Sequence, residues 1–95
     1  MQLDISAQAG RDIDEIFIYG LNHFGETVAR SYYNDLFDLF ELILATPQMA
    51  RQRTGLKYKC RMVVFQSHVV FYRTVRRNVR ILRVLHGKQN WRDHL

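Results

Sequence analysis

Cysteine and proline each occur only once in the 95 residues, and each scarcity excludes a class of protein. With Cys60 alone, the chain can form no internal disulfide and no multi-cysteine zinc site, which suits a reducing cytosol. Because proline is so scarce and 47% of the residues are hydrophobic, a packed globule is expected rather than a disordered chain. We therefore expect a single domain over residues 1–95.

Long apolar runs and clusters of ligand residues are also missing. No apolar run approaches about 18 residues, and no charged segment followed by an apolar run opens the chain, so neither a membrane span nor a secretory leader is predicted. The histidines, at His23, His68, His86 and His94, lack paired ligand spacing, and the glycines form no phosphate-binding loop. We expect no metal, no cofactor and a cytoplasmic location.

Charge is divided unevenly along the chain, although the total is only +5. Residues 1–50 contain two basic residues against eight acidic ones, a balance of −6, whereas residues 51–95 contain twelve basic residues against Asp93, a balance of +11. A domain polarised in this way attracts acidic partners to its C-terminal half. The alternative is a solvated basic face that lies opposite acidic helices.

The first half of the chain predicts a short strand followed by a helical hairpin. Residues 2–6 alternate between polar and apolar as a strand does, and Ser6 can cap the helix that the apolar spacing after it indicates. Gly25 should end that helix. A second apolar stripe predicts a helix over about 26–45, ended by Thr46-Pro47. Because almost no linker separates the helices, they should be antiparallel.

Two features of the first helix carry further expectations. Gly20 lies on its apolar face, where glycine costs about 1 kcal/mol relative to alanine, so we expect another helix to approach closely there. Asp12, Asp14 and Glu15 come early in the helix, where the helix dipole favours anions.

After residue 55 the chain becomes rich in Val, Phe, Tyr and Ile. We predict strands over about 58–65, 68–74 and 79–85, joined by hairpins at Gln66-Ser67 and Arg76-Arg77-Asn78. The fold class is therefore α+β, in the order β-α-α-β-β-β, with the helical hairpin packed on one face of a small antiparallel sheet. Because apolar residues occupy both faces of these strands, the C-terminal segment or a partner chain should cover the second face.

Cations, histidines and aromatic residues of the sheet region could act together on an anionic partner. Arginine and lysine could neutralise the charge that develops during RNA cleavage while histidine or tyrosine moves the protons. The same residues could grip acidic side chains of a protein, or bind nucleic acid without cleaving it. Composition and spacing leave these functions open. The residues are Arg61, His68, Tyr72, Arg73, Arg83, His86, Lys88, Trp91 and Arg92.

Simpler structural roles compete for several residues of this region. Phe71 and Tyr72 are typical core or sheet residues, and His68, which begins a strand after a tight turn, can form a local hydrogen bond. The arginines of the second turn can simply be solvated. Cys60 lacks an adjacent base, so burial as a small hydrophobic residue is expected in place of nucleophilic catalysis.

The order of these residues resembles the ParE branch of the ParE/RelE superfamily of bacterial toxin–antitoxin toxins. That branch commonly shows an arginine, a histidine seven residues later, and then Tyr-Arg. In the stretch CRMVVFQSHVVFYR these places are Arg61, His68 and Tyr72-Arg73.

The resemblance continues through the stretch ILRVLHGKQNWRDHL. Its residues 83–86 match a last strand that ends in Arg-Val-Leu-His, and Lys88-Gln89 match the basic residue and glutamine that follow. The helical region is similar as well, with Phe24-Gly25 at its corner and Thr46-Pro47 at its exit. The resemblance therefore covers nearly the whole chain.

The family implies a toxin without enzymatic activity that a ParD-like antitoxin holds silent. Several members poison DNA gyrase by trapping it on cleaved DNA. The antitoxin is typically a ribbon-helix-helix repressor whose C-terminal part wraps the toxin, so the resemblance implies that the toxin reaches operator DNA only through its antitoxin. The implied fold is a small β-sheet curved around a helical hairpin, in agreement with the pattern above.

The chain departs from the family pattern at three places. Lys59 and Gln66 stand where glycines are often found, which bears on the geometry of the first β-hairpin. Gly87 follows His86, whereas the ribonuclease relatives tend to carry a catalytic base or tyrosine beside the basic residues of the last strand. That difference favours ParE over the alternative, a RelE-like mRNA endoribonuclease that uses the basic sheet surface.

We expect two sets of partner-binding residues and no catalytic residue. The set expected to contact gyrase or the antitoxin is Arg61, Arg73, Arg83, His86, Lys88, Trp91 and Arg92. The set expected in the helix–sheet core or in a groove under the antitoxin is Phe17, Leu21, Tyr32, Leu36 and Phe40.

Overall fold

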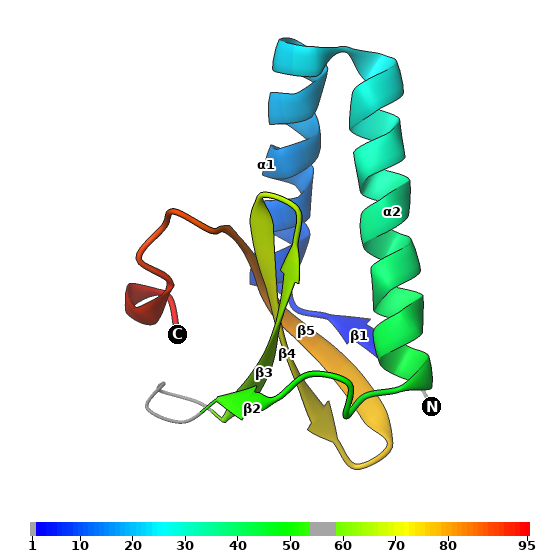
Figure 1. Ribbon diagram of the computed structural model, residues 1–95, viewed down its shortest axis with the longest axis vertical. Coiled ribbons are helices and arrows are strands. Elements are labelled where there is room, and N and C mark those ends of the chain that lie inside the picture. The colour runs from blue at the N-terminus through cyan, green and yellow to red at the C-terminus, as the bar shows by residue number, and fades with distance from the viewer. Residues whose placement is uncertain (1, 54–58) are drawn as a thin grey trace.

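The structure, a computed structural model, describes residues 2–53 and 59–95 and contains a helical hairpin beside a five-stranded sheet (Figure 1). Its strand order is β1-β5-β4-β3-β2, with β1 parallel to β5 and the other neighbours antiparallel. The elements are β1 (Leu3–Ile5), α1 (Ala7–Phe24), α2 (Glu26–Ala45), β2 (Gln52–Arg53), β3 (Cys60–Phe65), β4 (His68–Val75), β5 (Asn78–His86) and the 3-10 turn η1 (Trp91–Asp93).

The α+β class and the helical hairpin are confirmed, and the sheet differs from the prediction in two details. β1 makes the sheet mixed, because it runs parallel to the last strand. β2, a two-residue strand, was not predicted, since Gln52-Arg53 is too short to show any alternation. The third strand begins at Cys60, and the part predicted at residue 58 lies outside the described residues.

Local sequence signals determine both ends of α1 and its close contact with α2. The hydroxyl of Ser6 accepts a hydrogen bond from the Ala9 amide at 3.0 Å, which confirms the predicted N-cap of α1. Gly25 ends α1 with a φ of 87°, a conformation that glycine adopts without strain, and α2 begins at the next residue. A Cβ at Gly20 would lie 3.2 Å from the Ala29 Cβ, which confirms the predicted close approach of the helices.

The sheet has an apolar core on each face. On the inner face, Leu36, Phe40 and Ile43 of α2 pack with Tyr72 and Ile81. On the outer face, which lies away from the helices, Cys60, Phe71 and Leu85 form a second cluster that Leu95 closes and Trp91 covers.

The C-terminal segment therefore covers the second face of the sheet. The prediction had been that either this segment or a partner chain would cover it. Phe71 and Tyr72 are both completely buried, as predicted. Cys60 is buried too, and burial raises the pKa of its thiol.

The β3–β4 and β4–β5 hairpins each turn at a residue other than glycine in a left-handed conformation. Gln66 has a φ of 51° and Arg76 a φ of 59°, each at the first position of a two-residue turn. Glycine is the usual residue where φ is positive. Glycine, which the resemblance leads one to expect at position 66, would relieve strain there, but the turn forms with Gln66.

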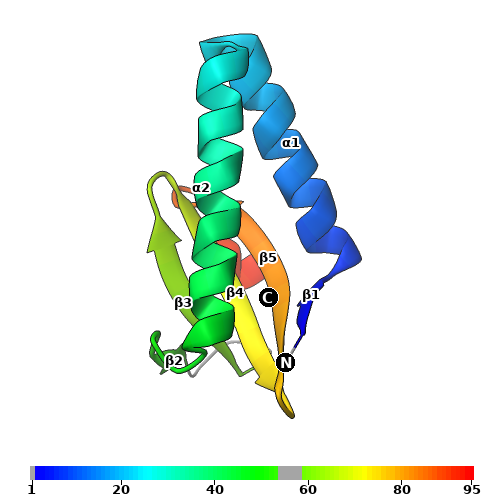
Figure 2. The same ribbon diagram turned by 90° about the vertical axis from the view of Figure 1, so that its right-hand side faces the viewer.

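The helical hairpin extends well beyond the sheet that it covers. Figures 1 and 2 show the lower parts of α1 and α2 beside the strands, while the corner at Gly25 projects past the sheet. The side chains near that corner have no sheet to pack against. Most of the exposed large apolar residues among the described residues accordingly lie on α1 and α2.

Candidate functional site: the hairpin groove

An open pocket of about 700 Å³ lies in the angle between the projecting helices and the adjacent end of the sheet. We call it the hairpin groove. Its lining comes from α1, α2, the β3–β4 turn, the end of β5 and the C-terminal segment. Its apolar wall is made by α1 and α2, and its polar end by the strands and the C-terminal segment.

The apolar wall contains large side chains that are unusually exposed. Phe24 is 62% exposed, Tyr19 57%, Val28 52% and Tyr33 39%. Leu36 closes the floor with almost no exposed surface. Contiguous exposed apolar surface of this kind marks a binding site for a protein or another apolar ligand.

The polar end of the groove contains a hydrogen-bonded pair from different elements. The Tyr32 hydroxyl of α2 lies 2.6 Å from the Nδ1 atom of His68, the first residue of β4. Burial, and to a lesser degree the neighbouring His86, lower the pKa of His68, which keeps the ring neutral at neutral pH. The predicted local hydrogen bond of His68 is therefore a long-range one, to a residue 36 positions away.

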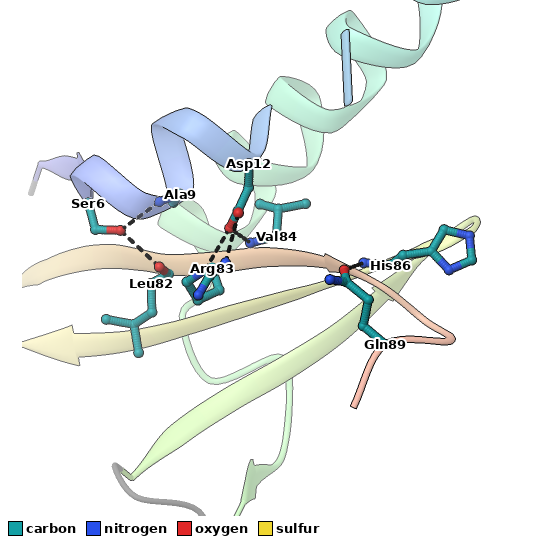
Figure 3. A network of polar contacts seen from close by, with 8 residues as sticks. All are labelled: Ser6, Ala9, Asp12, Leu82, Arg83, Val84, His86 and Gln89. Atoms are coloured by element: carbon teal, nitrogen blue, oxygen red, sulfur yellow. Dashed lines mark hydrogen bonds and ion pairs between the residues drawn. The ribbon is translucent and has the colours of Figure 1, made fainter. Parts of the chain in front are cut away.

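His86 lies beside His68 across the strand pair, with ring centroids 5.3 Å apart. Its Nδ1 atom accepts a hydrogen bond from the Lys88 amide at 3.1 Å. Its own amide donates to the Gln89 side chain at 2.7 Å (Figure 3). These contacts fix the turn that leads from β5 into the C-terminal segment.

Asp12 of α1 completes the edge of the sheet at the other side of the groove (Figure 3). Both of its carboxylate oxygens accept hydrogen bonds from the Arg83 guanidinium, at 2.8 and 2.9 Å, and one also accepts the Val84 amide at 3.0 Å. The hydrogen bond and the charge of Asp12 raise the pKa of Arg83, against the opposing effect of burial.

The helix-dipole explanation of Asp12 was wrong. Since α1 begins at Ala7, its first turn contains no acidic residue, and the dipole effect fades within one turn. The sequence could not reveal the actual partner, because Arg83 lies 71 residues away and no periodicity links the two positions.

The predicted partner-binding residues do not form one cluster. Arg61 is half-buried and donates to the Ala50 carbonyl, and Arg83 is engaged with Asp12. Arg73 is exposed on β4 and is paired with Arg80, whereas the C-terminal segment follows His86, which is paired with His68 at the other end of β4. In that segment, the Arg92 guanidinium lies 5.1 Å from the ring centroid of Trp91.

The predicted groove residues are distributed between the groove, the core and the exposed surface. Phe17, Tyr32 and Leu36 line the groove, whereas Phe40 does not, and Leu21 lies outside both the groove and the core and is exposed. Leu36 and Phe40 are buried in the inner core, with 1% and 0% of their surface exposed. The groove also contains Phe24, Val28 and Tyr33, which were not predicted as groove residues. The apolar stripe of a helix does not show which of its residues pack in a core and which line a groove.

Comparison with known proteins places this arrangement in a family. The family described as the ParE toxin of the type II toxin-antitoxin system parDE matches residues 3–91. The chain belongs to this family. Toxin ParE1 of Caulobacter vibrioides is 37% identical over 91 residues, which are 96% of this chain and 94% of that protein.

A solved structure described as a chromosomal ParDE TA system from P. aeruginosa has the same fold as this ParE-family chain. It aligns with a TM-score of 0.78 over 90% of this chain and 95% of that one, at 18% sequence identity. The resemblance to ParE toxins stated from the motifs is thereby confirmed.

Two negative findings apply to this ParE-family chain. Within residues 2–53 and 59–95, no three His, Cys, Asp or Glu side chains come close enough together to hold a metal ion. Over the same described residues, neither helix is long and apolar enough to cross a membrane.

Proposed function

We propose that this ParE-family toxin acts in the bacterial cytoplasm by binding DNA gyrase, and that a ParD-like ribbon-helix-helix antitoxin silences it. Membership of the family supports the toxin role. The hairpin groove is the observation that supports an antitoxin as its occupant, because it is open, elongated along two helices and walled by exposed apolar residues. In this proposal the toxin acts by binding and not by catalysis.

The groove suits an amphipathic protein segment. Such segments lay an apolar face into a hydrophobic groove and present large side chains at helical spacing. The excess of basic residues after position 50 would attract an acidic segment and accelerate its association. Phe24, Val28 and Tyr33 supply the apolar contacts, and His68 and His86 supply hydrogen bonds at the polar end.

The C-terminal segment supplies a second surface, for the target. Lys88 and Arg92 are exposed there, and Trp91 is half-buried against Phe71, with ring centroids 5.6 Å apart. An aromatic residue flanked by cations is a frequent feature of interface hot spots. We assign these residues to contact with gyrase.

The target assignment is tested with purified gyrase, supercoiled plasmid and the toxin, with and without its antitoxin. The expected result is an accumulation of double-strand breaks and a loss of supercoiling, both reversed by the antitoxin. Intact gyrase activity combined with cleaved mRNA after induction would instead support the RelE-like endoribonuclease. Intact gyrase activity and intact mRNA would show that neither target is correct.

The groove assignment has its own test, with variants matched for exposure. Val28→Asp places a charge on the groove wall, whereas Leu42→Asp places one on α2 outside the groove, and the wild-type residues are 52% and 51% exposed. We expect Val28→Asp to weaken antitoxin binding at least tenfold while toxicity persists, and Leu42→Asp to bind normally. Equal binding by both variants would remove the groove as the antitoxin site.

A further inference from the structure

The register of the sheet brings three arginines into one row on its outer face. Arg73 and Arg80 are paired across β4 and β5, and Arg53 of β2 is paired with Cys60 of β3. Continuing the β3–β4 register from Arg61↔Tyr72 places Cys60 opposite Arg73, so the row crosses four strands. Paired residues point to the same face, and Cys60 belongs to the outer cluster.

The row is open and nearly free of carboxylates. Arg53 and Arg73 are exposed, and Arg80 forms an ion pair with Asp4 that leaves 38% of the Arg80 side chain exposed. Between residues 51 and 92 the sequence contains no Asp or Glu. The β4–β5 turn adds Arg76 and Arg77, which are also exposed. In Figure 1, β2 and this turn lie at the end of the sheet away from the hairpin corner.

The chemistry of this end of the sheet differs from that of the hairpin groove. Most of the exposed large apolar side chains of the described residues belong to α1 and α2. At this end of the sheet the exposed ones are Val75, which precedes the turn, and Met49, which lines a small hollow with Arg76 and Arg77. Protein interfaces need an apolar centre, whereas interfaces with DNA are more polar and strongly positive. The row therefore fits a phosphate backbone better than an acidic protein.

The same surface favours a duplex over a single strand. Binding of single-stranded nucleic acid relies on aromatic rings that stack on bases. Among the residues that the structure describes, Trp91 is the aromatic residue of the outer face with exposed surface, and its ring already contacts Phe71 and the Arg92 guanidinium. Because neighbouring strands are about 4.8 Å apart, the row is about 15 Å long. Each strand of a duplex presents a phosphate about every 3.4 Å along the axis, so the row can reach several phosphates.

We propose that the row formed by Arg53, Arg73 and Arg80, together with Arg76 and Arg77, binds the phosphate backbone of duplex DNA. The contact is independent of base sequence. It is separate from the hairpin groove, so it does not depend on what occupies that groove or on gyrase being the target. It differs from the expectation that DNA is reached only through the antitoxin.

The test measures binding of the full-length toxin to a short labelled duplex of mixed sequence over a range of salt concentrations. Each phosphate contact contributes about 0.9 to the slope of log K against log salt. The double variant Arg73→Gln/Arg77→Gln should reduce the slope by roughly 2 and weaken binding at low salt at least tenfold. The control Arg11→Gln/Arg30→Gln removes the same charge from exposed positions on the helices and should leave the slope unchanged.

Four results would overturn the proposal. Equal losses in both double variants would mean that net charge alone attracts DNA, and absence of salt-dependent binding would mean that the row is only solvated. Tighter binding to single-stranded DNA or duplex RNA would exclude duplex DNA as the ligand. A row variant that loses affinity for polyglutamate but keeps its affinity for DNA would point to an acidic protein. Urea midpoints equal to that of the wild type in both double variants would establish that unfolding does not cause a loss of DNA binding.

Discussion

Arg83 and Asp12 join the last strand to the first helix through a bidentate ion pair, although 71 residues separate them in the chain. Their side chains are only 15% and 11% exposed. β1 ends at Ile5, opposite Ile81, so the next part of β5 has no neighbouring strand on that side. The Asp12 carboxylate accepts the Val84 amide there, so α1 closes the sheet edge.

Replacing Asp12 by alanine should destabilise the fold strongly. The change leaves the Arg83 guanidinium and the Val84 amide without their acceptor in a site that water reaches poorly. We expect a loss of roughly 2–4 kcal/mol in the free energy of unfolding, measured by urea titration. The matched control is Glu26→Ala, because the Glu26–Arg30 pair is about two-thirds exposed and should lose less than about 1 kcal/mol. Similar losses in both variants would contradict a structural role for the buried pair.

The close approach of the two helices at Gly20 predicts opposite effects for two glycine substitutions. Gly20→Leu would force a large side chain against Ala29, separate the helices and cost roughly 1–3 kcal/mol. Gly10→Ala meets nothing within 4 Å and should stabilise α1 by about 1 kcal/mol through helix propensity. Thermal unfolding monitored by circular dichroism measures both. A stable Gly20→Leu variant would show that the hairpin can open without loss.

The C-terminal segment should protect the outer core from solvent. Trp91→Ala removes a ring that packs on Phe71, and we expect a loss of roughly 2–3 kcal/mol, because the ring is only partly buried. The Cys60 thiol, which is buried and has a raised pKa, should then react much faster with a thiol reagent. The control Arg92→Ala keeps the ring and should leave the reaction rate near that of the wild type. An unchanged rate in Trp91→Ala would contradict the protective role.

The lowered pKa of His68 predicts a loss of stability in mild acid. Above the ordinary histidine pKa of about 6.5, the ring is neutral in both the folded and the unfolded chain, and it makes no difference. Below that value the unfolded chain binds a proton more readily than the folded chain, so the free energy of unfolding decreases as the pH is lowered. The decrease is at most about 1.4 kcal/mol per pH unit, and it ends where the folded ring is also protonated.

Urea titrations at several pH values test this dependence. His68→Gln should flatten the curve in the range just below the ordinary histidine pKa of about 6.5. If the curve of His68→Gln has the same slope as that of the wild type, another group causes the loss of stability in acid.

Much of the fold could be predicted because its signals are local. The Ser6 cap, the Gly25 corner and the apolar spacing of both helices depend on residues within a few positions of one another, and each was found where the sequence indicated. The apolar residues on both faces of the last strands also predicted a covered outer face. The parallel pairing of β1 could not be predicted, because three residues contain no information about their neighbour.

The candidate site was predicted less completely, for the same reason. The exposed arginines Arg73 and Arg92 were recognised as surface cations, but Arg83 was grouped with them although it is held by Asp12. Charge can be read from a sequence, whereas the partner of a charge depends on which distant segment the fold brings beside it.

The residue pattern was sufficient to predict the order of both helices and of every strand except β2, the helical corner, the polarity of charge and the family to which the chain belongs. These properties follow from short-range spacing and residue chemistry. Three features could be seen only in three dimensions: the hairpin projects past the sheet to form a groove, Arg53, Arg73 and Arg80 share one row, and Asp12 closes the edge of β5. Each of those depends on strand register and on the relative position of helix and sheet, which arise from packing between residues far apart in the chain.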